Sequence, residues 1–233
     1  MKLVTTDVWQ IDGADIRMAG GVRMPIGSGL IRLADRTLLL YSPVKISDED
    51  VGEINAEGEV RHIVAPNLFH HLYVKHAAER WPNATVHGAP GLAAKRSDLK
   101  IDRELGHTSI DSTVDVELIG GAPRINEALV FHRPSGTLLC ADFLFNVTNP
   151  ANLRTRFALA MMGVGGRELK QSRLWKLLAK NRDAVRASID RVLGWPIGSI
   201  LPAHGEPVTI TSADLAPKLS RAYGGAVASA LPA

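Results

Sequence analysis

Short apolar runs that end at glycine, proline or aspartate recur along most of the chain. Such runs, bounded by turn-forming residues, are typical of β-strands that are buried in a sheet. We predict strands at 7–11, 29–32, 37–41, 62–65, 84–87, 114–119, 127–132 and 137–141, and a last strand that ends at residue 201. The second and third of these runs are separated by a short polar turn, as are the seventh and eighth, and each pair is expected to form a hairpin.

Helical segments follow several of these strands. Ser47 precedes a cluster of acidic residues, which predicts a helix start, because serine caps free N–H groups and acidic residues complement the helix dipole. We predict a second helix at about 70–80, largely helical structure over 151–193, and a final helix from about 212. This order predicts an α/β protein, a four-layer αβ/βα sandwich of two mixed β-sheets with outer helices. No change in composition marks a linker, so a single domain over 1–233 is expected.

Composition places the chain among ordinary globular proteins. Hydrophobic residues make up 45% and charged residues 22%, and the formal net charge of +3 is too small to indicate nucleic-acid binding. We therefore expect no nucleic acid as a partner. No apolar stretch suits a signal peptide or a membrane span, so we expect no membrane partner either. Cys140, the single cysteine, lies in an apolar run, which predicts a buried, unreactive thiol and a cytoplasmic protein.

Side chains that bind metals stand just after three of the predicted strands. His204 follows the last strand and precedes Gly205, which lets the chain turn sharply. His70 and His71 follow a second strand, and Asp142 follows a third. Imidazoles and a carboxylate at strand ends are a suitable shell for Zn²⁺ and for other transition metals. These residues predict a metal site, and His204 is its clearest ligand.

Other roles are open for several of these side chains. Successive residues on a helix point about 100° apart, so one of His70 and His71 can bind metal while the other caps the helix or faces solvent. Asp142 can instead cap a turn or pair with an arginine. Glu127 is a spare ligand, a partner that orients a ligand, or an ordinary charge at a strand end. Glu206 can orient the nearby histidine or lie on the surface. The other histidines are expected to be structural or solvated: His62, His76, His87, His107 and His132.

The order of elements and the strand-end residues resemble the metallo-β-lactamase superfamily. In that superfamily the first metal motif, HxHxDH, follows a strand and opens a helix. The equivalent stretch here is PNLFHH at 66–71. Pro66 and Leu68 stand in place of the first two histidines, His70 replaces the aspartate, and His71 keeps the last histidine.

The rest of the family pattern is only partly kept. Asp142 matches the bridging aspartate and His204 the final histidine, whereas the loop at 120–123 lacks the histidine that the family has there. The resemblance therefore implies that the first metal position is lost and the second is kept, with His70, His71, Asp142 and His204 as ligands. It implies one divalent transition metal, for which we expect zinc, with iron or manganese as alternatives.

The resemblance also bears on activity. It implies a metal-dependent hydrolase of an ester, a lactone or a phosphoester, in which Asp142 would orient the attacking water. The loss of the first metal position favours an alternative, a catalytically inactive module that binds a partner. A mononuclear iron oxidoreductase is a third alternative, although members of the superfamily with that activity keep first-position histidines.

Residues 151–193 are expected to form a basic helical insertion. They carry ten basic and three acidic side chains, although the whole chain is nearly neutral. A cationic rim of this kind would favour a small anionic substrate, and the alternative is a solvated helical face. Four apolar residues of the insertion would cover the cleft or form a homodimer surface: Phe157, Leu159, Met161 and Met162.

Overall fold

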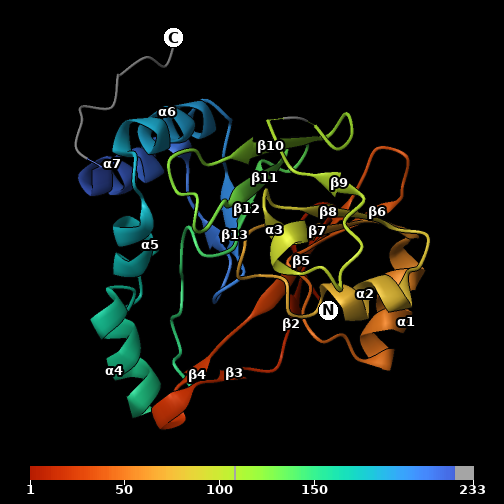
Figure 1. The fold of residues 1–233 in the computed structure, drawn as a ribbon, viewed down its shortest axis with the longest axis horizontal. Helices are drawn as coiled ribbons and strands as arrows, with labels where there is room; N and C mark the ends of the chain where they lie inside the picture. Colours follow the sequence, from red (N-terminus) through yellow and green to blue (C-terminus); the bar gives the residue numbers. More distant parts are fainter. Residues whose placement is uncertain (108, 224–233) are drawn as a thin grey trace.

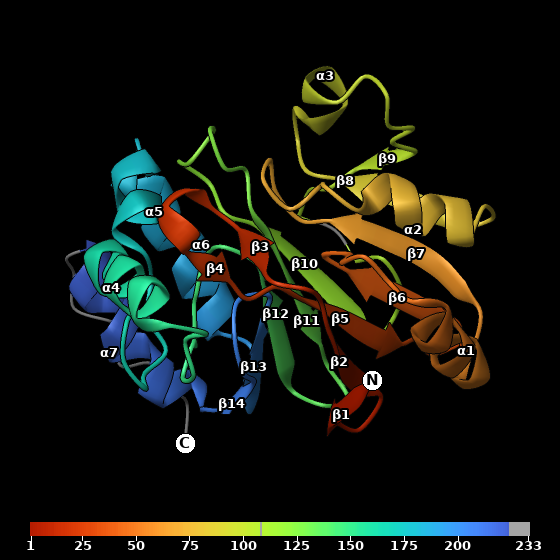
Figure 2. The same ribbon diagram turned by 90° about the horizontal axis from the view of Figure 1, so that it is seen from below.

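The computed structural model describes residues 1–107 and 109–223. Two β-sheets pack face to face, and helices cover both outer sides (Figure 1, Figure 2). The predicted four-layer αβ/βα sandwich is therefore confirmed. The expected domain over 1–233 includes residues 224–233, which lie outside the described residues.

The first sheet has seven strands in the order β1-β2-β5-β6-β7-β8-β9. Its first four strands pair antiparallel, and β6 to β9 pair parallel, so the sheet is mixed. The strands are β1 (Lys2–Thr5), β2 (Val8–Asp12), β5 (Gly27–Arg32), β6 (Leu38–Tyr41), β7 (Val60–Ala65), β8 (Thr85–Gly88) and β9 (Arg103–Glu104). A separate small hairpin of β3 (Ile16–Arg17) and β4 (Arg23–Met24) encloses the 3₁₀ turn η1 (Ala19–Gly21).

The second sheet has five strands in the order β10-β11-β12-β13-β14. Only β12 and β13 pair parallel in it, and this pairing brings the carboxyl ends of the two strands to the same edge. The strands are β10 (Val114–Leu118), β11 (Ala128–His132), β12 (Thr137–Cys140), β13 (Ser199–Pro202) and β14 (Val208–Thr209).

Seven helices are present in the described residues, and six of them divide between the two outer layers. α1 (Asp48–Glu57), α2 (Val74–Arg80) and α3 (Leu92–Lys95) belong to the half built on the first sheet (Figure 2). α5 (Arg173–Leu178), α6 (Arg182–Leu193) and α7 (Ser212–Tyr223) pack on the second sheet, and α4 (Leu153–Met162) contacts the β3–β4 hairpin. Ser47 caps α1 through a reciprocal capping box with Asp50, as the sequence predicted.

Alternate side chains along a strand belong to different hydrophobic cores, one between the two sheets and one beneath the outer helices. On β12, Leu139 packs between the sheets, whereas Leu138 and Cys140 pack against the outer helices. Successive strand residues point to opposite faces, so one apolar run supplies both cores. Cys140 is fully buried, as expected. Gly29 is needed where the two sheets pack together, because a Cβ at this position would lie 2.3 Å from Leu139 Cδ2.

One helical prediction requires correction. The helix expected from residue 70 begins only at Val74, and residues 70–73 form turns. The segment at 151–193 is largely helical, as predicted. It contains α4, α5 and α6, because Gly163 ends α4 in the left-handed region and Ser172 and Asn181 cap new helices. The short elements β1, β3, β4, β9, β14 and α3 were not predicted. Among the described residues, no helix combines the length and apolar character that crossing a membrane requires.

Candidate metal centre

The ends of β12 and β13 position two of the predicted ligands. Cys140 is paired with Pro202 in the parallel ladder, and Asp142 and His204 each follow two residues later. Because the two strands run in the same direction, both side chains emerge at the same edge of the second sheet. The sequence predicted that both residues stand just beyond strands, and the structure brings the two side chains into contact.

Gly205 shapes the turn that follows His204. Its φ is +107°, and a Cβ there would lie 2.1 Å from the Asn146 carbonyl oxygen. Asn146 closes this turn, because its N–H donates to the His204 carbonyl at 3.0 Å and its own carbonyl accepts from Glu206 N–H at 2.9 Å. A larger residue at position 205 would therefore displace the backbone that carries His204.

Asn67 positions the third side chain, His70. The Asn67 Oδ1 atom accepts the N–H groups of Phe69 at 2.8 Å and of His70 at 2.7 Å, which folds the chain back immediately after β7. Its Nδ2 donates to Asp142 Oδ2 at 2.9 Å. This fully buried amide therefore joins the loop of the first sheet to the strand end of the second, and sequence reasoning did not identify it.

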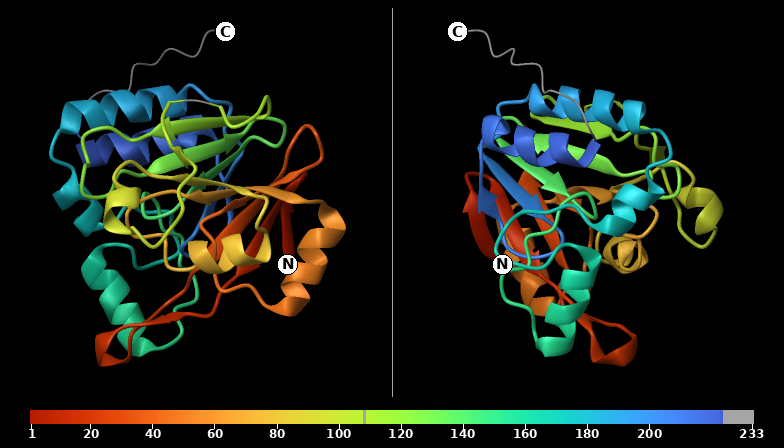
Figure 3. Two further views of the ribbon diagram at one scale, coloured as in Figure 1. Left: turned by 45° about the vertical axis from the view of Figure 1, so that its right-hand side comes forward. Right: turned by 90° about the vertical axis from the view of Figure 1, so that its left-hand side faces the viewer.

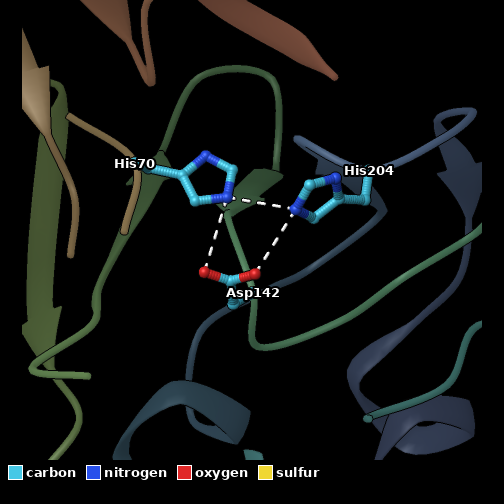
Figure 4. A group of neighbouring side chains, drawn as sticks. All are labelled: His70, Asp142 and His204. Atoms are coloured by element: carbon cyan, nitrogen blue, oxygen red, sulfur yellow. Dashed lines mark hydrogen bonds and ion pairs between the residues drawn. The ribbon is translucent and has the colours of Figure 1, made fainter. Parts of the chain in front are cut away.

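His70, Asp142 and His204 converge from these separate segments (Figure 4). The two histidine Nε2 atoms are 3.1 Å apart. His70 Nε2 lies 3.4 Å from Asp142 Oδ2, and His204 Nε2 lies 3.3 Å from Asp142 Oδ1. These three residues are named the HDH cluster below.

Hydrogen bonds hold the outward ring nitrogens of both histidines. His204 Nδ1 lies 2.8 Å from the Pro25 carbonyl oxygen, which can only accept, so Nδ1 carries the proton. His70 Nδ1 lies 2.7 Å from Ser42 Oγ. Ser42 has a φ of +53°, an uncommon conformation for a residue other than glycine, and its Oγ reaches His70 from there. Both Nε2 atoms are thereby directed into the cluster, as metal-binding histidines require.

Glu127 supports Asp142 from behind. Its Oε1 accepts the N–H groups of Ala141 at 2.8 Å and of Phe143 at 2.9 Å, on either side of Asp142. Its Oε2 accepts the indole N–H of Trp175 at 3.1 Å. Of the three roles open for Glu127, the structure therefore favours a partner that orients a ligand. Burial raises the pKa of Glu127 to about 7, assisted by the charge of Asp142 and opposed by these hydrogen bonds.

The pKa values of Asp142 and His204 are shifted in opposite directions. Burial opposes the charged form of Asp142, but the nearby His70 and the hydrogen bonds from both histidines hold its pKa well below the usual range. Burial likewise lowers the pKa of His204, but the hydrogen bond to Asp142 and its negative charge outweigh this effect and raise it. The carboxylate is thus ionised and its surroundings favour positive charge, which suits a cation site.

His71 is not brought into the cluster. Its Nδ1 lies 2.7 Å from Arg96 Nη1, and because a guanidinium can only donate, Nδ1 must accept. The proton of the neutral ring then sits on Nε2, which leaves His71 no free lone pair for a metal. Burial and the charges of Lys95 and Arg96 also lower the pKa of His71. The described geometry therefore supports three of the four predicted ligands and gives His71 an arginine partner instead.

Glu206 and the other histidines do not take part in the cluster. Glu206 is exposed and forms an ion pair with Lys2 at 3.5 Å, so it does not orient His204. His62 and His87 contact each other, at 2.9 Å between ring nitrogens. The remaining histidines have separate partners: His76 has Ile46 O, His107 has Glu117, and His132 has Ser135.

A small pocket of about 40 Å³ opens beside the cluster. His70, His204 and Ser42 form its polar side. Its other walls are apolar and include Ile16 of the β3–β4 hairpin and Phe69 of the loop after β7. The pocket therefore has apolar walls next to the imidazole rings of His70 and His204.

The donor set fits a divalent transition metal. Two imidazole nitrogens and one carboxylate oxygen are ligands that zinc commonly takes from proteins. Bonds of about 2.0–2.1 Å in a tetrahedron separate neighbouring ligand atoms by about 3.3 Å. The observed separations of 3.1, 3.3 and 3.4 Å are close to that edge length. These three residues would hold the metal and would leave one position of a tetrahedral site open.

Comparisons with known proteins agree with this fold. A profile described as "Domain of unknown function (DUF4336)" matches residues 6–162. No curated protein sequence matches the chain. Among solved structures, a metallo-β-lactamase from Pontibacter korlensis has a TM-score of 0.63 and 15% identity, with 96% of this chain and 98% of that chain covered.

Two further solved structures have the same fold. The metallo-β-lactamase FIM-1 from Pseudomonas aeruginosa, described in a mono-zinc form, has a TM-score of 0.58 and 15% identity, over 94% of this chain and 95% of that chain. A metal-soaked Flv1 flavodiiron core from Synechocystis sp. PCC6803 has a TM-score of 0.63 and 13% identity, over 94% of this chain and 59% of that chain. The resemblance to the metallo-β-lactamase superfamily is thus confirmed at the level of the fold.

Proposed function

The chain belongs to DUF4336, a family described as a domain of unknown function, and we propose that it is a metal-dependent hydrolase with a mononuclear site. The observation that carries this proposal is the convergence of His70, Asp142 and His204, with ligand atoms within 4.8 Å of one another, beside a pocket. We propose zinc as the metal. The mixed nitrogen and oxygen donor set supports zinc, and a relative of the same fold is described in a mono-zinc form.

The chain's own residues would prepare the site for hydrolysis. Ser42 and the Pro25 carbonyl hold the outer ring nitrogens, so that the imidazoles keep their orientation. Asn67 Nδ2 donates to Asp142 Oδ2. The other carboxylate oxygen, Oδ1, lies beside His204. A bound divalent cation would supply Lewis-acid polarisation of a substrate carbonyl or phosphoryl oxygen and of a water molecule. Asp142 is the residue that we assign to orienting that water.

The pocket and the basic insertion bear on the substrate. We propose a small molecule with an ester, lactone or phosphoester group, whose apolar part would occupy the pocket walls around Ile16 and Phe69. The basic residues of 151–193 support an anionic group elsewhere on the substrate. The buried single cysteine supports a cytoplasmic location.

Elemental analysis combined with hydrolysis assays tests this function. Protein expressed with added zinc, iron or manganese is expected to retain about one metal ion per chain. Hydrolysis of p-nitrophenyl acetate, a lactone and bis-p-nitrophenyl phosphate is then compared for wild type, Asp142→Asn and His107→Ala. We expect activity to be lost in Asp142→Asn and kept in His107→Ala, because His107 is an exposed histidine remote from the cluster. Metal retention without hydrolysis of any ester, lactone or phosphoester would contradict the enzymatic proposal.

A non-catalytic role is the second candidate. Pro66 and Leu68 occupy the two positions where the superfamily has its first histidines, and no histidine lies at 120–123. A chain without the first metal position can keep the fold as a binding module. Purified protein with only trace metal after supplemented expression would favour this candidate over the hydrolase.

A further inference from the structure

One face of α4 is apolar and points away from the rest of the molecule. Leu153, Phe157 and Met161 are 77%, 69% and 60% exposed. They are spaced four residues apart, so on a helix they fall within about 80° of one another. Thr155 and Leu159 lie on the opposite side and are buried. The apolar stripe is therefore not a core face, and large apolar side chains are rarely displayed together on a surface without a partner.

Exposed apolar side chains also occur on the elements next to α4. Leu174 and Leu177 of α5 are also exposed, and Met18 is exposed on the hairpin that α4 contacts. Helices α4 and α5 follow one another along the same side of the molecule (Figure 1, Figure 3). Arg173 Nη1 donates to the Met161 carbonyl at 3.3 Å, which joins the two helices. Leu153, Phe157, Met161, Leu174, Leu177 and Met18 are named the α4 surface below.

The charge around the α4 surface is strongly positive. Between residues 153 and 178 the chain has six basic residues and one acidic residue, Glu168, which pairs with Lys218 at 3.9 Å. On the helix, Arg154 and Arg156 flank the apolar stripe on its two sides, at about 60° and 100° from its centre. Long arginine side chains in this position can extend to headgroups while the apolar side chains between them are buried. The Arg154 guanidinium also donates to the Gly20 carbonyl of the hairpin at 3.5 Å.

We propose that the α4 surface docks on an anionic phospholipid bilayer. The exposed apolar stripe offers side chains for burial among lipid tails, and the arginines beside it, with no acidic residue on the helix, offer positive charge to anionic headgroups. A second copy of the chain fits less well, because a two-fold interface would place these basic residues against their own copies. Anionic headgroups instead neutralise them. The expectation of no membrane partner rested on the lack of a spanning segment, which surface binding does not need.

Docking through α4 would also place the pocket near the lipid surface. Arg23 N–H of the β3–β4 hairpin donates to Thr155 Oγ1 at 2.9 Å, and Asn152 Nδ2 donates to the Gly21 carbonyl at 3.3 Å. The same hairpin contributes Ile16 to the pocket wall. The proposal itself does not depend on catalysis, because none of the residues of the α4 surface belongs to the HDH cluster.

Vesicle co-sedimentation tests the proposal. Wild-type protein is expected to bind vesicles of phosphatidylcholine mixed with phosphatidylglycerol, to bind pure phosphatidylcholine less, and to dissociate at high salt because salt screens the arginines. The double variant Phe157→Ser/Met161→Ser should weaken binding by at least about tenfold, since two large apolar side chains no longer enter the lipid. Arg154→Gln/Arg156→Gln should reduce the preference for anionic over neutral vesicles.

Matched variants separate this proposal from the others. Leu3→Ser changes an exposed leucine of β1 and should bind vesicles like wild type, as should His204→Ala, which tests the metal site. All variants are checked by circular dichroism. Wild-type protein that does not bind anionic vesicles would overturn the proposal. So would equal loss of binding in Leu3→Ser, or a dimer in sedimentation velocity that Phe157→Ser/Met161→Ser converts to a monomer without any lipid binding.

Discussion

Two pairs of histidines meet in the described part of the chain at similar distances, and only one of them has the features of a metal site. The ring nitrogens of His62 and His87 lie 2.9 Å apart, and those of His70 and His204 lie 3.1 Å apart. His62 and His87 project from the middle of neighbouring parallel strands, β7 and β8, whereas His70 and His204 stand in loops beyond strand ends.

The surroundings of the two pairs explain the difference. Burial lowers the pKa of both His62 and His87, and His87 falls to about 4. Two neutral rings can satisfy each other there, one as donor and one as acceptor, without a third group. At the HDH cluster the Nδ1 atoms of both histidines already have hydrogen-bond partners outside the cluster. Asp142 adds a negative charge that raises the pKa of His204. Contact between histidines is therefore not sufficient, and a carboxylate with oriented rings makes the cation site.

Removing one ring from each pair should give the largest contrast. His204→Ala is expected to abolish metal retention, because it removes one of only three ligands, while His87→Ala should leave the metal content unchanged. Elemental analysis of the purified variants measures both. Circular dichroism confirms folding, since Gly205 and β13 are untouched in His204→Ala. Full metal occupancy in His204→Ala would remove this residue from the site and with it the distinction between the two pairs.

The pH dependence of stability should distinguish the second pair. Below about pH 6.5 the unfolded His87 binds a proton, whereas the folded His87, with a pKa lowered from 6.5 to about 4, does not. The unfolded state is then favoured, so the free energy of unfolding falls as the pH drops from 6.5 towards 4. For a buried ring this difference amounts to roughly 3 kcal/mol.

Urea unfolding of metal-free protein at several pH values measures this effect. Wild type and His87→Gln are compared, because glutamine keeps a polar side chain but does not titrate. The loss of stability between pH 6.5 and 4.5 should be smaller in His87→Gln. Titration of the HDH cluster is common to both proteins and cancels in the comparison. An equal slope in the two proteins would show that His87 is not held neutral.

The sequence predicts best what depends on local pattern. β12 and β13 are uninterrupted apolar runs, so the positions of Asp142 and His204 just beyond them follow directly. Elements of two residues, such as β9 and β14, carry no periodic signal, because their pairing depends on neighbours distant in the chain. The start of α2 was placed too early, because the apolar residues after His70 resemble a first helical turn.

The part of the site that was missed depends on contacts across the two sheets. Asn67, between Pro66 and Leu68, has the composition of an ordinary turn, and only the structure shows its amide donating to Asp142. Ser42 likewise precedes a proline and gave no signal of a contact with His70. Both residues stand immediately beyond a buried strand. In a chain with histidines at other strand ends, an asparagine or serine in that position is the signal that would have indicated a contact with the site.

Substitution of Asn67 should weaken the site without removing a ligand. In Asn67→Ala both Asp142 Oδ2 and the N–H of His70 lose a hydrogen-bond partner, so metal affinity is expected to fall by about 10- to 100-fold. Competition with a chelator of known affinity measures this change. Asn55→Ala is the control, because it also removes a side-chain amide partner, of Trp81, but far from the cluster. Unchanged affinity in Asn67→Ala would mean that Asn67 does not orient Asp142.

The smallest effect is expected at His71, the predicted ligand that the structure assigns to Arg96. His71→Gln keeps an acceptor for the Arg96 guanidinium, so metal affinity should stay within about twofold of wild type, because loss of a bonded ligand would cost far more. The same chelator competition measures it, with His107→Ala as the histidine control. A loss as large as that of Asn67→Ala would show that Arg96 leaves His71 when metal binds. The metal would then have three histidine ligands and one carboxylate, and the HDH cluster would describe only the metal-free arrangement.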